Sequence, residues 1–189
     1  MRARRRLPVW YLGLVAASGA LRLIELRRSS RNEHALGAQD HPAAGHYQAM
    51  VGLHVALHTL PLVEVLWFQR RARLPWLWAG VLGAATALRW WSIASLGAAW
   101  NARGAVPDPL PVVTRGPYRF VRHPNYVAVT LDFLALPLAG GAWVSALMLT
   151  ALNVAVLTER VREEERRLLA VPAYRAAFER RKRFLPGVF

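Results

Sequence analysis

The sequence predicts an all-α integral membrane protein with a single domain and about five transmembrane helices. Of the 189 residues, 54% are hydrophobic, and they gather into stretches close to the roughly twenty residues that a helix needs to cross a bilayer. Arginines cluster at the ends of these stretches. The net charge of +14 could indicate nucleic-acid binding, but apolar stretches of this length exclude a soluble basic domain. We therefore interpret the arginines as flanks of membrane spans and expect no nucleic-acid partner.

Two apolar stretches in the first third of the chain predict the first two spans. Residues 7–26 form the first, and the polar residues 27–45 are expected to be a loop. Residues 46–68 form the second, which a cluster of arginines ends. Arg22 and Glu25, near the end of the first span, are three residues apart and can therefore pair on one helix face.

The third span is expected at residues 74–100, which begin with tryptophans typical of a membrane interface and contain an embedded Arg89. Glu64 in the second span is a candidate partner for this arginine. His54 and His58 have the spacing of a metal-ligand pair on a helix. Without a third ligand nearby, packing or hydrogen bonding between helices is the better interpretation, so no metal is expected.

A short fourth helix and a fifth helix are predicted to form a packed hairpin. Residues 127–139 rise only about 20 Å as a helix, and the double glycine that follows makes a tight connection to residues 142–158. Asp132 within the fourth helix is costly in a bilayer and implies a partner or a cavity. Residues beyond 158 are expected to continue as a charged helical extension.

With five spans, residues 27–45, residues 101–125 and the C-terminal region lie on one side of the membrane. They carry more than twice as many Arg and Lys residues as the opposite side. The positive-inside rule therefore places this side in the cytoplasm.

The segment at residues 115–126, R-G-P-Y-R-F-V-R-H-P-N-Y, carries most of the chain's candidate chemistry. Two X-Pro steps bias it away from helix, and its arginines, histidine, tyrosines and asparagine suit an anionic or polar ligand. A second set lies on the fifth helix, where Asn153, Leu157, Arg160 and Glu164 share one face. Charged stripes are often only solvated helix faces, but the polar Asn153 inside the span favours a site, because a buried polar group needs a partner.

Together the two sets suit S-adenosylmethionine. Arginines can bind its carboxylate, glutamates its ribose hydroxyls, ammonium group or sulfonium, and aromatic rings its adenine. NADPH shares the adenine and ribose and remains an alternative, although the sequence has no Gly-rich dinucleotide motif.

These motifs resemble the isoprenylcysteine carboxyl methyltransferase family. The resemblance is carried by G-P-Y-R-F-V-R-H-P-N-Y at residues 116–126, by the helical hairpin after it, and by E-R-V-R-E-E-E-R-R-L-L at residues 159–169. The chain is similar more narrowly to the small bacterial branch, which includes methyltransferases of alkylpyrones and alkylresorcinols. That likeness extends to R-L-I-E-L, S-x-R-N-E and L-G-x-x-W-N at residues 22–26, 29–33 and 96–101. The R-H-P-N-Y motif also occurs in membrane reductases, so an NADPH-dependent reductase is the rival enzyme class.

The resemblance implies one methyltransferase domain over residues 1–189, with three spans in residues 1–100, a cofactor-binding loop at residues 101–126, and the hairpin and cytoplasmic tail at residues 127–189. Arg122 and Glu164 are the expected catalytic residues, Arg122 stabilising a substrate oxyanion and Glu164 acting as a cofactor carboxylate or a base; their roles could be exchanged. The residues expected to bind S-adenosylmethionine are Tyr118, His123, Pro124, Asn125, Tyr126, Asn153, Arg160, Glu164 and Glu165.

The expected acceptor is a lipophilic molecule that enters from the bilayer, most simply a long-chain phenolic or pyrone polyketide lipid methylated on oxygen. A prenylcysteine-type carboxyl or a small thiol is the alternative. An apolar gap beside the short fourth helix, near Pro137 and Gly140, is expected to admit the alkyl tail. The expected location is the bacterial inner membrane, with membrane lipids as neighbours and the active site facing the cytoplasm.

Overall fold

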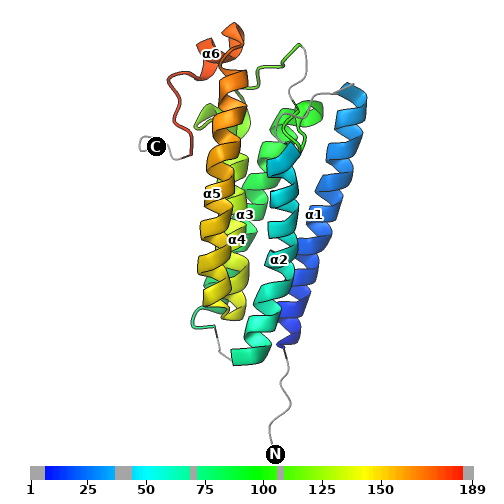
Figure 1. Cartoon of the computed structure of the whole chain (residues 1–189), viewed down its shortest axis with the longest axis vertical. Coiled ribbons are helices and arrows are strands. Elements are labelled where there is room, and N and C mark those ends of the chain that lie inside the picture. The colour runs from blue at the N-terminus through cyan, green and yellow to red at the C-terminus, as the bar shows by residue number, and fades with distance from the viewer. Residues whose placement is uncertain (1–6, 37–43, 69–71, 106–108, 185–189) are drawn as a thin grey trace, which may run out of the picture.

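The computed structural model describes residues 7–36, 44–68, 72–105 and 109–184. Over these ranges the chain is helical and forms no strand, so the all-helical class is confirmed; one isolated β-bridge joins Val121 to Lys182. Five long helices run alongside one another, and a short sixth lies at one end of the bundle (Figure 1). The elements are α1 (Val9–Leu36), α2 (Ala44–Phe68), α3 (Pro75–Leu96), η1 (Gly97–Ala99), η2 (Gly116–Arg119), α4 (Pro124–Gly140), α5 (Trp143–Leu168) and α6 (Pro172–Phe178).

The bundle has the surface of a membrane protein. Among the described residues, α1, α2 and α5 are the helices long and apolar enough to cross a membrane. Large apolar side chains project from the outside of the bundle, including Trp67, Trp76 and Leu147, each more than half exposed. An exposed apolar surface of this extent is unfavourable in water and suits lipid.

Two predicted boundaries are wrong, and local chemistry explains both. Helix α1 continues to Leu36, so residues 27–36 are helix and not loop; residues 37–43 of the predicted loop lie outside the described ranges. The sequence offers no glycine or proline between residues 20 and 36 to end the helix, and Ser29 donates to Glu33 one turn later at 2.7 Å. Helix α4 begins at Pro124, earlier than expected, because proline at the first helical position has no N–H to leave unpaired.

Helix α4 forms the centre of the core. Its residues Phe133, Ala135, Leu136 and Ala139 are fully buried, with α3 and α5 packed along it. At the far end, the ring of Tyr11 lies directly on Gly140, where an added Cβ would come within 2.2 Å of a ring carbon. The expected apolar gap near Pro137 and Gly140 is therefore wrong, since the small glycine lets an aromatic ring close this end of the bundle.

Glu64 on α2 holds the start of α5. Its carboxylate accepts hydrogen bonds from the backbone N–H of Val144 (3.0 Å) and Ser145 (2.7 Å) and from the Ser145 hydroxyl (2.6 Å). These N–H groups have no partner inside α5, and a negative charge also suits the positive end of the helix dipole. The expected pairing of Arg89 with Glu64 is wrong, because Arg89 instead bonds Glu25 on α1.

Candidate functional site

A cavity of about 530 Å³ lies within the bundle, toward the end that carries α6. Its wall is mostly apolar and is built from α1 to α5, the segment between α3 and α4, and Tyr174 of α6. A cavity of this size can hold a cofactor or a drug-sized molecule. Two polar groups line it. We call the group of Tyr126, Arg160 and Glu164 the outer end, and the group of Arg22, Glu25 and Arg89 the inner end.

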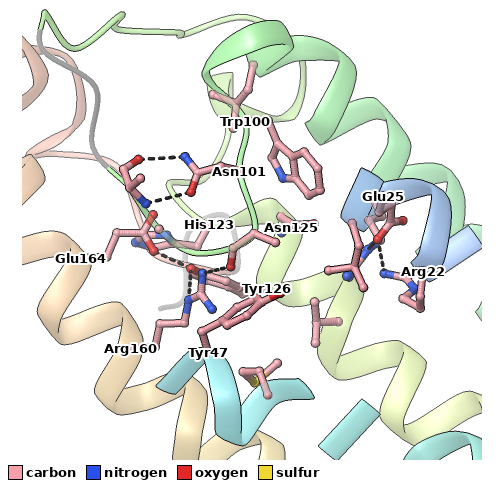
Figure 2. A pocket seen from close by; sticks show the side chains of 18 of the residues that line it. Arg22, Glu25, Tyr47, Trp100, Asn101, His123, Asn125, Tyr126, Arg160 and Glu164 are labelled. Carbon is pink, nitrogen blue, oxygen red and sulfur yellow. Dashed lines mark hydrogen bonds and ion pairs between the residues drawn. The ribbon is translucent and has the colours of Figure 1, made fainter. Parts of the chain in front are cut away.

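The outer end is a fixed chain of hydrogen bonds between α4 and α5 (Figure 2). Arg160 Nε donates to the Tyr126 hydroxyl at 3.0 Å, and that hydroxyl donates to Glu164 Oε2 at 2.5 Å. Tyr126 lies in the first turn of α4, while Arg160 and Glu164 are one turn apart on α5. Arg160 Nη2 also donates to the carbonyl of Ala102 at 2.6 Å. The result is a pre-oriented carboxylate at the cavity wall.

Glu165, the neighbour of Glu164, lies behind this wall. Its buried carboxylate accepts from Arg122 Nη1 at 3.1 Å and from Arg183 Nε at 2.9 Å, and His123 Nε2 lies 3.0 Å away. Backbone hydrogen bonds connect the same two segments. The N–H of Arg122 donates to the Lys182 carbonyl and the N–H of His123 to the Arg183 carbonyl, both at 2.9 Å. Glu165 thus joins the segment before α4 to α5 and to the chain after α6.

The segment after α3 is tied down by the end of α1. Asn32 donates to the carbonyls of Gly97 (3.1 Å) and Trp100 (2.6 Å), and the Ser29 hydroxyl accepts from the N–H of Ala102 at 2.8 Å. Asn101 then closes the turn by bonding both the N–H and the carbonyl of Ala105 at 2.8 Å. These polar residues hold a lining segment of the cavity in place.

The tyrosines near the outer end stay protonated. Burial, with the charge of Glu164 as the next cause, raises the pKa of Tyr118 well above its ordinary value. Burial, Glu164 and Glu165 raise the pKa of Tyr174 in the same direction. Both phenols are therefore hydrogen-bond donors at neutral pH and not candidate bases.

Most of the predicted site residues meet at the cavity. Those that line it are Tyr118, Arg122, His123, Asn125, Tyr126, Arg160 and Glu164. Pro124 and Glu165 do not line it. Pro124 begins α4, and Glu165 forms the contacts behind the wall. Asn153 does not line it either: it is fully buried against α4 and donates to Thr130 at 3.3 Å. Seven residues before Arg160, it lies about 10 Å along α5, below the outer end.

Sequence reasoning gave no role to Ser29, Asn32 and Asn101, although they stand within two of the motifs that carry the family resemblance. The inner end was not predicted as a site, because a structural pair with Glu64 was preferred for Arg89 over a role in binding a substrate headgroup; the signal for the site was the set of charges inside apolar stretches. His54 and His58 bond carbonyls one turn earlier, at 2.8 and 2.7 Å. Within the described ranges, no group of three His, Cys, Asp or Glu side chains could hold a metal ion.

Two comparisons with known proteins bear on this site. The model of the isoprenylcysteine carboxyl methyltransferase family matches residues 78–170, which include α4, α5, nearly all of α3, and the whole R-H-P-N-Y segment. The chain is also 30% identical over 158 residues to the uncharacterized protein YpbQ of Bacillus subtilis (strain 168), and the match covers 82% of this chain and 94% of that protein.

Proposed function

The chain belongs to the isoprenylcysteine carboxyl methyltransferase family, and from this premise we propose that it is an S-adenosylmethionine-dependent methyltransferase acting on a lipophilic acceptor in the membrane. The observation that carries the proposal is the cavity itself. Its outer end presents the carboxylate of Glu164 on a hydrogen-bonded frame, and its flank is lined by apolar side chains of the bundle surface.

The chemistry of the outer end fits this cofactor. Asn125 Oδ1 is buried and has no hydrogen-bond partner among the residues that the structure describes, so it is a candidate acceptor for an amino group. Glu164 suits ribose hydroxyls or a positive charge, the rings of Tyr118 and Tyr126 suit adenine or a sulfonium, and Arg122 suits a carboxylate. When bound, the cofactor supplies an electrophilic methyl group.

The chain's own residues would then position the acceptor and take its proton. Methyl transfer requires an in-line approach, so positioning is the main contribution of the protein. A phenolic or enolic oxygen must also lose a proton, and Glu164 is the proposed base. Arg122, which also lines the cavity, would stabilise the negative charge left on that oxygen. An acceptor that is already a carboxylate, as in the prenylcysteine alternative, would need no base.

The acceptor is proposed to enter from lipid between α1 and α2. Leu23 and Leu26 of α1 and Val51 and Val55 of α2 line the cavity and are also exposed on the outside of the bundle. Such side chains give an alkyl tail a continuous apolar path from the bilayer. This path replaces the expected gap beside α4, and it supports an acceptor with an alkyl tail, for which a long-chain phenolic or pyrone lipid is our proposal.

The location is proposed on the arrangement of the bundle. Helices α3 and α4 lie alongside the three apolar helices α1, α2 and α5, which supports five crossings (Figure 1). The cavity's outer end lies where the arginine-rich ends of α1 and α5 emerge. By the positive-inside rule we place this end in the cytoplasm and the bundle in a bacterial inner membrane.

Calorimetry on the purified protein in detergent tests the cofactor. S-adenosylhomocysteine, the product form, is expected to bind much more tightly than NADPH, and Glu164→Gln is expected to weaken that binding. Glu179→Gln, an exposed carboxylate outside the cavity, is the matched control and should bind like the wild type. Tight binding of NADPH with no heat from S-adenosylhomocysteine would replace the methyltransferase with a reductase.

A chain-length series in proteoliposomes tests the acceptor. Long-chain alkylresorcinols or alkylpyrones are expected to be methylated well, and a short water-soluble analogue poorly, at equal membrane concentration. A short phenol or small thiol that is the better acceptor would contradict the lipid assignment.

A further inference from the structure

Four charged side chains, three buried and one partly buried, form a cluster at the inner end of the cavity, and none of them belongs to the motifs of the outer end. Arg22 and Glu25 come from α1, Arg89 from α3 and Asp132 from α4. Arg22 Nη1 and Arg89 Nε lie 2.7 and 2.9 Å from Glu25 Oε2. The same arginines lie 3.4 and 3.6 Å from Asp132 Oδ2. The cluster is neutral as a whole, so its members can be buried together.

The cluster does not satisfy all of its own polar atoms. Glu25 Oε1, Arg89 Nη1 and both oxygens of Asp132 are buried without a hydrogen-bond partner among the described residues. Glu25, Arg89 and Asp132 are 3%, 6% and 3% exposed, so water at the protein surface does not supply the missing hydrogen bonds. Unsatisfied charged atoms are destabilising, and a cluster with a purely structural role would gain by pairing them.

Two of these four atoms, Glu25 Oε1 and Arg89 Nη1, belong to side chains that line the cavity. Glu25 and Arg89 line it together with Arg22, whereas Asp132 does not. Figure 2 shows Arg22 and Glu25 on one side of the pocket and Arg160 and Glu164 on the other, with Asn125 and Tyr126 between them. The inner end therefore places Glu25, whose Oε1 has no hydrogen bond among the described residues, beside two guanidinium groups at the wall of the same cavity as the outer end.

We infer that the inner end is a binding subsite for a second, unmethylated oxygen group on the acceptor's head. A hydroxyl fits best, because it can donate to Glu25 Oε1 and accept from Arg22 or Arg89. A carboxylate fits poorly, because Glu25 would repel it. The inference rests on the proposed lipophilic acceptor and narrows it to molecules with two oxygens on the head, of which one is methylated and the other is held.

Equilibrium binding without cofactor tests this subsite. The protein in nanodiscs is titrated with an alkylresorcinol and with the alkylphenol of the same chain, which lacks one ring hydroxyl; empty nanodiscs give the partition baseline. A hydrogen bond to a charged group corresponds to roughly a tenfold or greater difference in affinity, so the wild type is expected to prefer the resorcinol by about that factor. Equal affinities in the wild type would overturn the inference, whether or not any variant folds.

Two matched variants separate binding from structure. Glu25→Gln replaces a charged acceptor with a neutral amide oxygen, so it is expected to reduce the preference for the resorcinol while it still binds the alkylphenol. Asp132→Asn removes a carboxylate from the same cluster but not from the cavity wall, so it is expected to keep the preference. An undiminished preference in Glu25→Gln, or an equal reduction in both variants, would show that the cluster only connects α1, α3 and α4 structurally.

The outcome is independent of the test of function. If the wild type methylates the alkylresorcinol but binds both ligands alike, the subsite is wrong and the methyltransferase stands. If the preference is present and no methyl group is transferred from S-adenosylmethionine, the methyltransferase is wrong and the subsite stands as a ligand site.

Discussion

Glu164 and Glu165 are adjacent on α5, and the same substitution to glutamine is expected to reduce ligand binding at the first position and stability at the second. Glu165 is 3% exposed and is contacted by Arg122, His123 and Arg183. A glutamine there keeps one acceptor oxygen but turns an N–H₂ group toward a donor, which leaves the partly buried guanidinium of Arg122 without its counter-charge. Breaking a buried pair in this way costs about 3–5 kcal/mol.

The expected result for Glu165→Gln is a large loss of stability. For a chain of this length, that free energy corresponds to a fall in melting temperature on the order of 10 °C. Glu164→Gln faces the cavity and leaves Tyr126 an acceptor oxygen, so its melting temperature should stay close to that of the wild type, with binding of S-adenosylhomocysteine reduced.

Thermal unfolding and calorimetry of both variants in one detergent measure these effects side by side. The temperature of the binding experiment is set below the melting point of Glu165→Gln, so that only folded protein is compared. Two results would refute the assignment of Glu164 to ligand binding and of Glu165 to stability. One is a Glu165→Gln variant as stable as the wild type, and the other is a Glu164→Gln variant that binds normally but has a lowered melting temperature.

Three further substitutions test the frame around the cavity. Glu64→Gln should destabilise the protein by about 1–3 kcal/mol in denaturant unfolding, because it weakens the bonds to the start of α5. Gly140→Ala should lower the melting temperature, because its methyl group would overlap the ring of Tyr11, and Tyr11→Leu should recover part of the loss. Asn32→Ala should weaken S-adenosylhomocysteine binding with little loss of helicity by circular dichroism, because it frees the segment after α3; the exposed Arg31→Ala should match the wild type.

The sequence predicted the long helices because their apolar length is a local property. The second span agrees with α2 within two residues, and α5 continues into its charged extension as the lack of a breaker indicates. The end of α1 was misplaced because polarity was interpreted as a loop, whereas a helix that leaves the membrane can be polar and still have no residue to end it.

The partners of buried charges could not be predicted from spacing. Arg89, Glu64, Glu25 and Asp132 are recognisable in the sequence as charges that need partners, but which one each meets depends on how the helices rotate and pack. Arg22 and Glu25 were paired correctly because they lie on one helix. The residues of the outer end gathered as expected because each half of it is a short local motif. Asn153 shared a helix face with Arg160 and Glu164, yet sharing a face says nothing about depth along the axis.

The cavity has polar groups at its two ends and apolar side chains on its flank, and this arrangement suits an acceptor that enters from lipid, as proposed. A tail that moves from lipid into an apolar cavity exchanges one apolar environment for another, so the roughly 0.8 kcal/mol per methylene gained on leaving water contributes little to recognition. Discrimination must then come from the head. A hydrogen bond made inside the apolar bundle is stronger than one made in water, and an unmade one is costly. A cavity with charged groups at both ends can therefore select a head by the placement of its oxygens, while the apolar flank between α1 and α2 accepts tails of many lengths.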